Sequence, residues 1–458
     1  MITIKKIFKL TSYVLIAGIF AIALSGCTAK PSTTDPNANK IVVWSFESED
    51  SWKSTIKAFE SKNKGYKVVY QKQVFDSLYE NRVLNSILST GTPDVWSMPN
   101  DWVYRHKDKL SPMPDTIAKT VNMDTAYVPA IKESVVFNDK IYALSPSAQP
   151  LMVYYNQKLL NQTQDLIISN TKDSNERKRI SLLFQDIPTV WSDFVELSKL
   201  LTVKDGSTIT QSGVALGTSA ITNGTDILSL LMLQNETDII SSDYKLATFN
   251  LPKSTSTGAN DVPGKRALEF YSSFANTSSP NYSWNDSLGN DIDAFGNGKA
   301  VMIFGYSDLQ NTLLQKYPNL QYKKAYTPQL QSDSSKIKDF ATFNAFGVSK
   351  LSKTPSISWN LITTLAGDHA DDFNSVNKLY TSKKATSYDI SITNRTTGNP
   401  EKLSLATADS LVKGRYPVEF NAFMKSAINS VNSGTQNAQT ALDLISNQIT
   451  EMLRSDSW

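Results

Sequence analysis

Cysteine and histidine are nearly absent from this chain of 458 residues, which contains one Cys and two His. A single thiol cannot form a disulfide within the chain. One thiol and two imidazoles also provide few ligands for a transition metal. We therefore expect no metal and no cofactor. His106 and His369 lie among charged residues in helical patterns, and both are expected at the solvated surface.

An excess of charge of one sign is also missing. The net charge is +3, but Lys5, Lys6 and Lys9 lie within the first 26 residues, which contain no carboxylate. The rest of the chain has 43 basic and 43 acidic residues. Binding to a phosphate backbone requires a basic surface, so no nucleic-acid partner is expected.

The longest apolar run, from Leu10 to Leu24, is short for a membrane span. It follows the three lysines and ends in Leu24-Ser25-Gly26-Cys27, which resembles the lipobox of bacterial lipoproteins. The resemblance implies a signal peptide over residues 1–26 and a diacylglyceryl group on Cys27, which would anchor the chain to the extracytoplasmic face of the cell membrane. A plain secretory signal or an N-terminal anchor helix is the alternative.

Residues 27–40 are rich in Thr, Pro, Asn and Lys and predict a flexible tether. Apolar runs with strand and helix periodicity then alternate. The pattern predicts strands at 41–46, 66–70 and 94–98, separated by helices at 51–61 and 78–88. Such a βαβαβ series indicates a mostly parallel sheet whose ligands bind beyond the carboxyl ends of its strands. Residues 46–49 and 97–102 are therefore expected at the mouth of a cleft.

The remaining sequence is long enough for a second domain. Helices are expected at 191–201, 226–233, 265–274, 358–366 and within 418–453, and strands at 301–304 and 346–349. The polar segments 161–179 and 254–263 are expected to be loops.

A series of short motifs resembles the family 1 extracellular solute-binding proteins, the sugar-binding group that includes maltose-binding protein. The motifs are Ala58-Phe59-Glu60 to Val68, Gly91-Thr92-Pro93-Asp94-Val95-Trp96, Asn138 to Pro146, Tyr154 to Leu160, Pro188 to Phe194 and Ala294 to Met302. Segment 161–186 is longer than the usual family connection, and Phe343-Asn344-Ala345-Phe346 stands where many members have Gly-Gly-Trp.

This resemblance implies an α/β fold of two lobes joined by hinge strands, with residues 41–148 and 301–350 in the first lobe and 149–300 and 351–458 in the second. It also implies capture of a sugar by lobe closure, delivery to the membrane permease of an ABC transporter, a monomeric state and no catalysis. A polyol, a glycerol phosphate or a peptide remains possible as the ligand. A secreted glycoside hydrolase is the other alternative, but no motif fixes the two carboxylates that it needs.

Sugar binding requires polar side chains beside aromatic rings in a partly dry cleft. Glu47 and Ser48 follow the first strand, Trp102 could stack on a sugar or cover a helix, and Trp284 is expected to be a stacking platform. The full set of candidate ligand-binding residues is Phe46, Glu47, Ser48, Asn100, Trp102, Ser147, Gln149, Trp284, Tyr306, Phe343, Asn344, Phe346 and Arg395. For Arg395 a solvated surface position is the alternative.

Two other patterns are interpreted as structural. Residues 296–300 are similar to a fragment of a phosphate-binding loop, but they precede a strand and lack the Ser or Thr, so a turn is expected. Asp291 and Asp293 are too close in sequence to share a helix face, and capping of the next helix is expected for them.

Overall fold

The computed structural model describes residues 39–254, 260–330, 336–384 and 399–455. These residues lie in one compact unit, Asn39–Trp458. The predicted signal peptide, Cys27, residues 28–38 of the predicted tether and Arg395 lie outside the described residues. The first strand begins at Asn39, two residues before the predicted start at residue 41.

The first sheet has the strand order β2-β1-β3-β15-β4. Its strands are β1 (Asn39–Ser45), β2 (Tyr66–Lys72), β3 (Val95–Pro99), β15 (Asn344–Ser349) and β4 (Leu110–Ser111). The strands β2, β1 and β3 run parallel, whereas β15 and β4 add antiparallel pairs. The predicted βαβαβ series is confirmed, and the sheet as a whole is mixed because a strand returning from elsewhere in the chain completes it.

Helices on this sheet enclose the first hydrophobic core, in which Trp52 packs edge-on against Phe346 at 5.1 Å between ring centroids. We call this group of elements the first lobe. Its helices are α1 (Glu49–Lys62), α2 (Tyr79–Thr90), α3 (Trp102–His106), α4 (Asp115–Val121), α5 (Met123–Ala126), α6 (Pro129–Val135), α14 (Pro355–Ala366) and α15 (Ala370–Asn377). A 3-10 turn η1 (Lys107–Lys109) and the hairpin strands β5 (Val136–Phe137) and β6 (Lys140–Ile141) complete it.

The second sheet has the order β17-β14-β7-β12-β9-β8, and β13 and β16 also pair with β7. All ten residues of the central strand β7 are buried. The strands are β7 (Ser147–Asn156), β8 (Val203–Asp205), β9 (Thr208–Val214), β12 (Ala300–Tyr306), β13 (Tyr322–Ala325), β14 (Asp339–Thr342), β16 (Tyr380–Thr381) and β17 (Ala408–Asp409). This sheet is also mixed, because β7 runs antiparallel to both β12 and β14.

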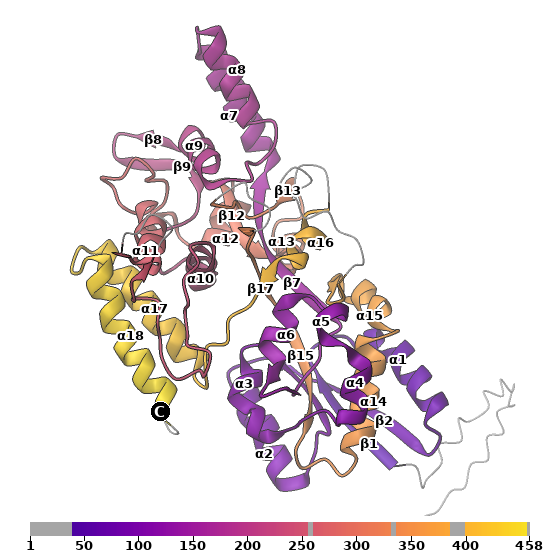
Figure 1. Cartoon of the computed structure of the whole chain (residues 1–458). Helices are drawn as coiled ribbons and strands as arrows, with labels where there is room; N and C mark the ends of the chain where they lie inside the picture. The colour runs from indigo at the N-terminus through magenta and orange to yellow at the C-terminus, as the bar shows by residue number, and fades with distance from the viewer. Residues whose placement is uncertain (1–38, 255–259, 331–335, 385–398, 456–458) are drawn as a thin grey trace, which may run out of the picture. The chain divides into compact units, whose positions relative to one another are not determined.

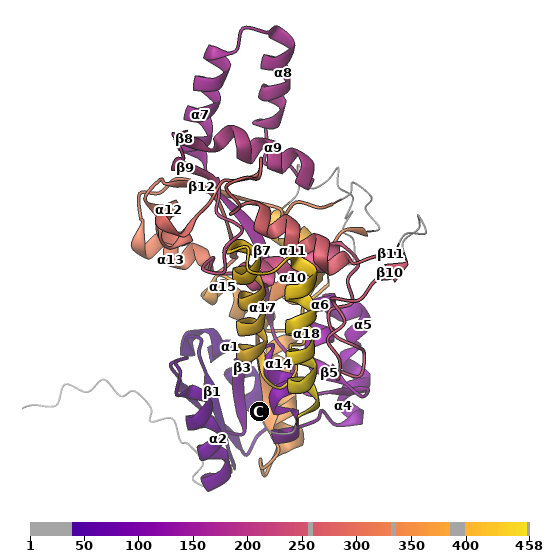
Figure 2. The ribbon, with the colours of Figure 1, turned by 90° about the vertical axis from the view of Figure 1, so that its left-hand side faces the viewer.

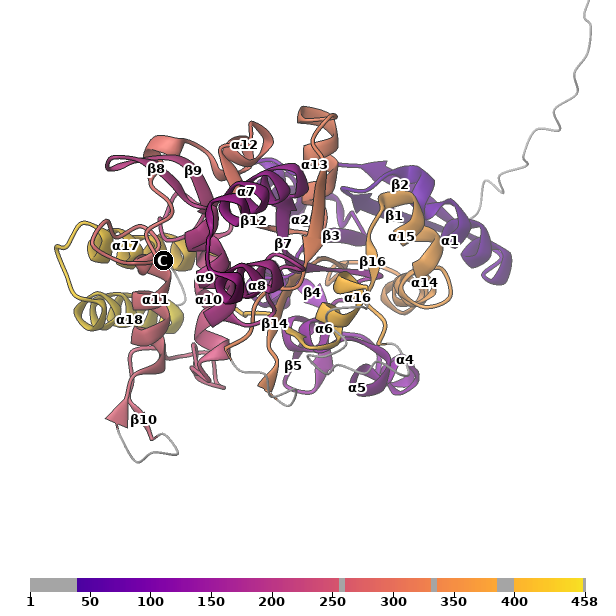
Figure 3. The ribbon, with the colours of Figure 1, turned by 90° about the horizontal axis from the view of Figure 1, so that it is seen from above.

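Helices pack on most of this sheet and enclose the second core with it. We call these helices and the strands that they cover the second lobe. The helices are α7 (Gln157–Asn170), α8 (Ser174–Leu183), α9 (Trp191–Leu201), α10 (Gly224–Gln234), α11 (Pro263–Ser273), α12 (Asp291–Gly296), α13 (Leu309–Lys316), α17 (Pro417–Asn432) and α18 (Ala438–Arg454). Figure 3 shows α17 and α18 lying side by side. Smaller elements are β10 (Lys253–Ser254), β11 (Asn260–Asp261), η2 (Asp286–Leu288) and α16 (Pro400–Ala406).

Over the residues that the structure describes, the chain passes between the two cores three times (Figure 1). Within β7, Ala148 belongs to the first core and Leu151 to the second. Phe340 of β14 belongs to the second core, whereas the next residue, Ala341, belongs to the first. After β17 the chain enters the second lobe for the last time and forms α17 and α18. The fold is therefore the expected pair of α/β lobes joined by strands.

The lobe boundaries differ from the predicted ones in two places. Strand β12, expected to begin a first-lobe segment, packs in the second core because it pairs with β7 and β9. Helices α14 and α15, expected in the second lobe, contribute Trp359 and Phe373 to the first core. The crossing occurs at β14–β15, and the two helices follow β15 back onto the first sheet.

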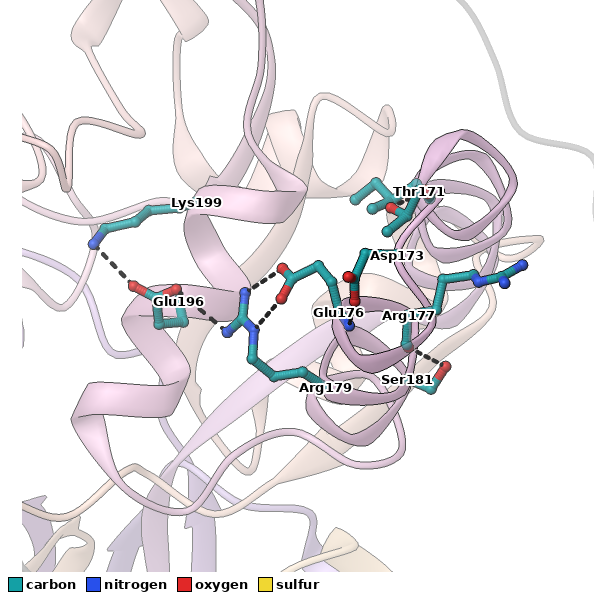
Figure 4. A network of polar contacts seen from close by, with 9 residues as sticks. Thr171, Asp173, Glu176, Arg177, Arg179, Ser181, Glu196 and Lys199 are labelled. Atoms are coloured by element: carbon teal, nitrogen blue, oxygen red, sulfur yellow. Dashed lines mark hydrogen bonds and ion pairs between the residues drawn. The ribbon is translucent and has the colours of Figure 1, made fainter.

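Segment 161–179, expected to be a loop, instead forms most of the helical hairpin α7–α8 (Figures 1 and 2). The side chain of Asn156 caps α7, and Asp173 caps α8 by accepting a hydrogen bond of 2.8 Å from the backbone N–H of Glu176. Arg179 binds both carboxylate oxygens of Glu176 and reaches Glu196 of α9 at 3.8 Å (Figure 4). Local capping and ion pairs thus make this polar sequence helical.

Replacing Asp173 with Ala should destabilise α8 by about 1 kcal/mol, because one backbone N–H at its first turn loses its acceptor. Amide hydrogen exchange in residues 174–183 should become faster, with the rest of the second lobe unchanged. Asp165→Ala, an exposed substitution within α7, is the control. Equal exchange in both variants would show that the Asp173 side chain does not hold the helix.

Candidate functional site

The carboxyl ends of β1, β2 and β3 lie at one edge of the first sheet because these strands are parallel. The chain returns from the second lobe at the same edge, where Asn344 at the start of β15 pairs with Pro99 at the end of β3. Residues 46–48, 73–78 and 100–102 therefore meet next to a lobe crossing. This is the place where ligands bind in open α/β sheets.

Glu47 is fixed at this edge by three contacts. Its Oε1 accepts a hydrogen bond of 3.1 Å from Nδ2 of Asn344, and its Oε2 accepts one of 2.5 Å from the hydroxyl of Ser45. The hydroxyl of Tyr70 donates to the Glu47 backbone carbonyl at 2.7 Å. The carboxylate is thus oriented by the last residue of β1 and by the first residue of β15.

A second polar group joins the lobes. Nζ of Lys413 lies 3.0 Å from Oδ1 of Asp226 and 4.0 Å from Oδ2 of Asp101, and the Lys413 side chain is only 8% exposed. The hydroxyl of Tyr306 donates to Oδ2 of Asp226 at 2.7 Å. Asp101 follows β3 in the first lobe, whereas Asp226 and Tyr306 come from α10 and β12 of the second. We call Asp101, Asp226, Tyr306 and Lys413 the Lys413 cluster.

The charges in this cluster depend on one another. Burial raises the pKa of Asp101, against the effect of the Lys413 ammonium. Burial lowers the pKa of Lys413, but Asp226 and Asp101 raise it more, and its net shift is upward. Burial and the neighbouring Asp226 carboxylate raise the pKa of Tyr306, so its hydroxyl keeps its proton. A buried charge is tolerated only when it is paired, and here one ammonium pairs with carboxylates from both lobes.

Gln149 in β7 faces Asp308, which follows β12. The surrounding groups favour the orientation in which the amide nitrogen of Gln149 faces Asp308, at 2.9 and 3.1 Å from the two carboxylate oxygens. Asp308 lies next to the Lys413 cluster, because its carboxylate also acts on Tyr306. Acidic and amide groups therefore extend from the first sheet to the end of β12.

Aromatic rings lie directly beside these polar groups. Phe46, next to Glu47, packs against Phe75 at 4.9 Å and Tyr79 at 4.7 Å between ring centroids. Trp102, next to Asp101, packs against Phe75 at 5.5 Å. We call Phe46, Phe75, Tyr79 and Trp102 the aromatic cluster. Tyr79 is fully buried, whereas Phe75 is 52% exposed.

The sequence matches the family model for a bacterial extracellular solute-binding protein over residues 54–372, well over half of the chain. The chain belongs to this family. The family is extracellular, so this solute-binding protein works outside the cytoplasm. A search of curated proteins gave no match.

Solved structures share the fold of this solute-binding protein at low sequence identity. The cyclic α-maltosyl-1,6-maltose binding protein of Arthrobacter globiformis has a TM-score of 0.68 and 16% identity, covering 91% of this chain and 99% of that one. The sugar-binding protein MalE of Xanthomonas citri gives 0.67 and 17%, covering 91% and 97%. UgpB of Mycobacterium tuberculosis, in complex with glycerophosphocholine, gives 0.61 and 14%, covering 91% and 98%.

Within its described residues, this solute-binding protein has no helix that is long and apolar enough to cross a membrane. The same residues contain no group of three or more His, Cys, Asp and Glu side chains arranged to hold a metal ion.

Several candidate residues have their side chains in polar or aromatic contacts at the crossing, as described for Phe46, Glu47, Trp102, Gln149, Tyr306 and Asn344. Asn100 also lies there, but Thr342 and Ser134 occupy its side-chain amide at 2.8 and 3.1 Å. Ser48 caps α1 by accepting from the Asp50 N–H, and Ser147 is buried in β7. These last three positions hold the lobes and helices in place.

Three aromatic candidates lie in the cores and correct the prediction. Trp284 was expected to be a stacking platform, but it is 1% exposed in the second core. Its loop folds back so that the backbone N–H of Trp284 donates to the backbone carbonyl of Phe274. Phe343 and Phe346 are 2% and 0% exposed in the first core. Phe346 packs against Trp52 of α1 at 5.1 Å and Phe373 of α15 at 6.1 Å between ring centroids, where an apolar ring gains most from burial.

Sequence reasoning overlooked Lys413 and Phe75. Lys413 is more than 180 residues from either carboxylate, so no spacing rule could connect them. Phe75 could have been found, because an apolar Val74-Phe75 pair in a polar segment after the second parallel strand reaches the same sheet edge as residues 46–48.

Two structural interpretations also need correction. His106, expected at the surface, is 4% exposed between Trp96 and Trp102. Asn290 caps α12, whereas Asp291 is buried and accepts a hydrogen bond from the hydroxyl of Thr222. Capping of that helix therefore belongs to the residue before the expected pair.

A charged group beside the aromatic cluster also reaches the second lobe. Oε1 of Glu80 lies 2.6 Å from Nε of Arg105 and 3.0 Å from Nε2 of His106. The polar contacts with His106 and Arg105 lower the pKa of Glu80 to about 2. Nη1 of Arg105 donates to the Arg415 carbonyl at 2.7 Å, two residues after Lys413.

Replacing Glu80 with Gln should reduce the free energy of unfolding at pH 7 by at most about 3 kcal/mol. The pKa of Glu80 is lower in the folded state, so its contribution is complete above about pH 4.5 and is lost as the pH falls toward 2. Denaturant unfolding at pH 7, 4 and 2 should therefore show the variant and the unmodified protein converging in acid. Glu451→Gln, at an exposed position of α18, is the control. A difference that stays constant down to pH 2 would contradict this role.

Proposed function

We propose that this solute-binding protein captures a carbohydrate between its two lobes and delivers it to the permease of an ABC transporter. The observation that carries the proposal is the Lys413 cluster, which brings carboxylates from both lobes to one place beside the aromatic cluster. Related folds support it, since their names include a binding protein for cyclic α-maltosyl-1,6-maltose and a complex with maltotetraose.

The chemistry of a sugar matches this surface. Carboxylates and amides pair with its hydroxyl groups, and such hydrogen bonds to charged groups are worth about 1.5–3 kcal/mol each. Phe46 and Trp102 offer apolar faces to the C–H side of a sugar ring. A ligand that contacts Asp101 and Asp226 at once stabilises the closed arrangement of the lobes, because only that arrangement provides both contacts. The closed, monomeric protein would then engage the permease.

A phosphorylated ligand fits the described residues less well. Asp101 and Asp226 share the ammonium of Lys413, whereas Glu47 and Asp308 accept hydrogen bonds from the uncharged amides of Asn344 and Gln149. Carboxylates repel a phosphate in a region of low dielectric constant. One related fold was solved with glycerophosphocholine, but the acidic surroundings favour an uncharged sugar here. Binding without hydrolysis is the proposed activity.

A calorimetric titration of the purified protein with mono- and oligosaccharides, polyols and sugar phosphates tests this proposal. A bound sugar at 100 times its Kd should stabilise the fold by about 2.7 kcal/mol. Asp226→Asn should weaken the affinity roughly 10- to 100-fold, because a charge-assisted hydrogen bond becomes a neutral one. Small-angle scattering should show a smaller radius of gyration with the sugar bound.

Asp124→Asn is the matched control, since this carboxylate is 71% exposed and pairs only with Lys132 among the described side chains. Its affinity for the sugar should equal that of the unmodified protein. Binding of sugar phosphates alone, or of no member of the panel, would refute the carbohydrate assignment.

We further propose that Cys27 carries the lipid anchor and that residues 1–26 are removed. The lipobox Leu24-Ser25-Gly26-Cys27 after a basic and apolar segment supports this. Two acyl chains suffice for stable membrane anchoring. In cells that express the full chain, Cys27→Ser should move the protein from the membrane fraction to the soluble extracytoplasmic fraction, whereas Ser25→Ala should leave it in the membrane. An unchanged distribution of the Cys27→Ser chain would contradict the anchor.

A further inference from the structure

The loop between β2 and α2 exposes an unusual amount of apolar surface. Within five residues, Val74, Phe75 and Leu78 are 69%, 52% and 60% exposed. Apolar patches of this kind on a protein surface mark binding sites, because their exposure to water is unfavourable. The loop follows the second parallel strand and therefore lies at the same sheet edge as Glu47 and Asp101.

The loop is held in place by polar contacts on its own backbone. Nη2 of Arg82 donates to the Val74 carbonyl at 2.7 Å, and Nη1 of Arg82 lies 2.7 Å from Oδ1 of Asp76. The same carboxylate oxygen accepts a hydrogen bond of 3.0 Å from the Leu78 N–H. The apolar side chains are thus presented by a fixed loop, which lowers the entropic cost of binding to them.

Phe75 continues the surface that the polar groups begin. Phe46 and Trp102 are the immediate chain neighbours of Glu47 and Asp101, and Phe75 packs on both of them at 4.9 and 5.5 Å. One side of Phe75 is covered by these rings, whereas half of its surface is open. The carboxylates of Glu47 and Asp101 are thus followed first by Phe46 and Trp102 and then by Phe75, which is an order from polar to aromatic groups.

We propose that Phe75 is a specificity-determining residue on which an additional sugar ring stacks, and that the ligand is an oligosaccharide rather than a monosaccharide. This inference rests on the proposed carbohydrate function. A sugar unit bound by the carboxylates occupies the polar part of the surface, and Phe75 lies one aromatic ring further out. Val74 and Leu78 expose further apolar surface in the same loop. If this surface instead bound an apolar segment of another protein, the carboxylates beside Phe46 and Trp102 would have no role in binding it.

Glycan-array binding of the full chain, followed by calorimetry with the bound glycan at one to six units, tests the inference. The unmodified protein should gain affinity with the second and third units. Phe75→Ala should lose roughly tenfold in affinity for the longer glycans, as expected for about 1.4 kcal/mol of ring stacking, and nothing for the monosaccharide. Leu88→Ala is the matched control, because Leu88 is 69% exposed on the adjoining helix α2 and lies outside the aromatic cluster.

Each outcome decides a different question. Sugar binding that does not depend on chain length, or an equal loss at every length in Phe75→Ala, would overturn the role of Phe75 and leave the carbohydrate function intact. An equal loss in Leu88→Ala would also overturn it, since any exposed apolar residue would then serve. Binding of no glycan at all would overturn both proposals.

Discussion

The buried ammonium of Lys413 constrains how the two lobes can be arranged. It lies between Asp226 of the second lobe and Asp101 of the first, and its side chain is 8% exposed. A charge in such a place must remain paired, since removing one partner from a buried ion pair costs several kcal/mol. Separation of the lobes would part Lys413 from one carboxylate, and water would have to replace it. Charged groups lie at the crossing because they come from both lobes and meet where the lobes join. Separating the lobes would therefore also bring water to Lys413.

Hydrogen bonds at the crossings connect this region to the fold. Asn100, directly before Asp101, accepts from Thr342 of β14 and donates to Ser134 of α6. The hydroxyl of Ser134 in turn lies 2.5 Å from that of Ser410, just after β17. Two of the three crossings are thus tied to the loop that positions Asp101. Satisfied polar networks of this kind fix one geometry, because each unpaired buried group would be costly.

The sequence predicted best what local periodicity determines. Strands β1, β2 and β3 and helices α1 and α2 follow from apolar spacing, and their order alone places Glu47 and Asp101 at a common edge. The lobe boundaries were not predictable in this way, because the crossing occurs between Phe340 and Ala341, two neighbouring apolar residues inside one short strand. The hairpin α7–α8 was missed because its polar composition resembles that of a loop, although Asp173 and Glu176 have the spacing of a capping box. Trp284 was misplaced because its loop, rich in Gly, Asn and Ser, gave no sign of folding back onto the second core.

The two residues that sequence reasoning missed, Lys413 and Phe75, also determine which ligands the site can bind. Lys413 makes an acidic region stable enough to be buried, and Phe75 leaves an aromatic face open beside it. A ligand must therefore offer many hydroxyl groups on one side and an apolar face on the other, and it must tolerate carboxylates in a poorly hydrated place. An anion fails the last condition, and a purely apolar molecule fails the first, because it has no hydroxyl groups to pair with the carboxylates and amides. An uncharged oligosaccharide meets all three conditions, since each of its rings has both a polar rim and an apolar face.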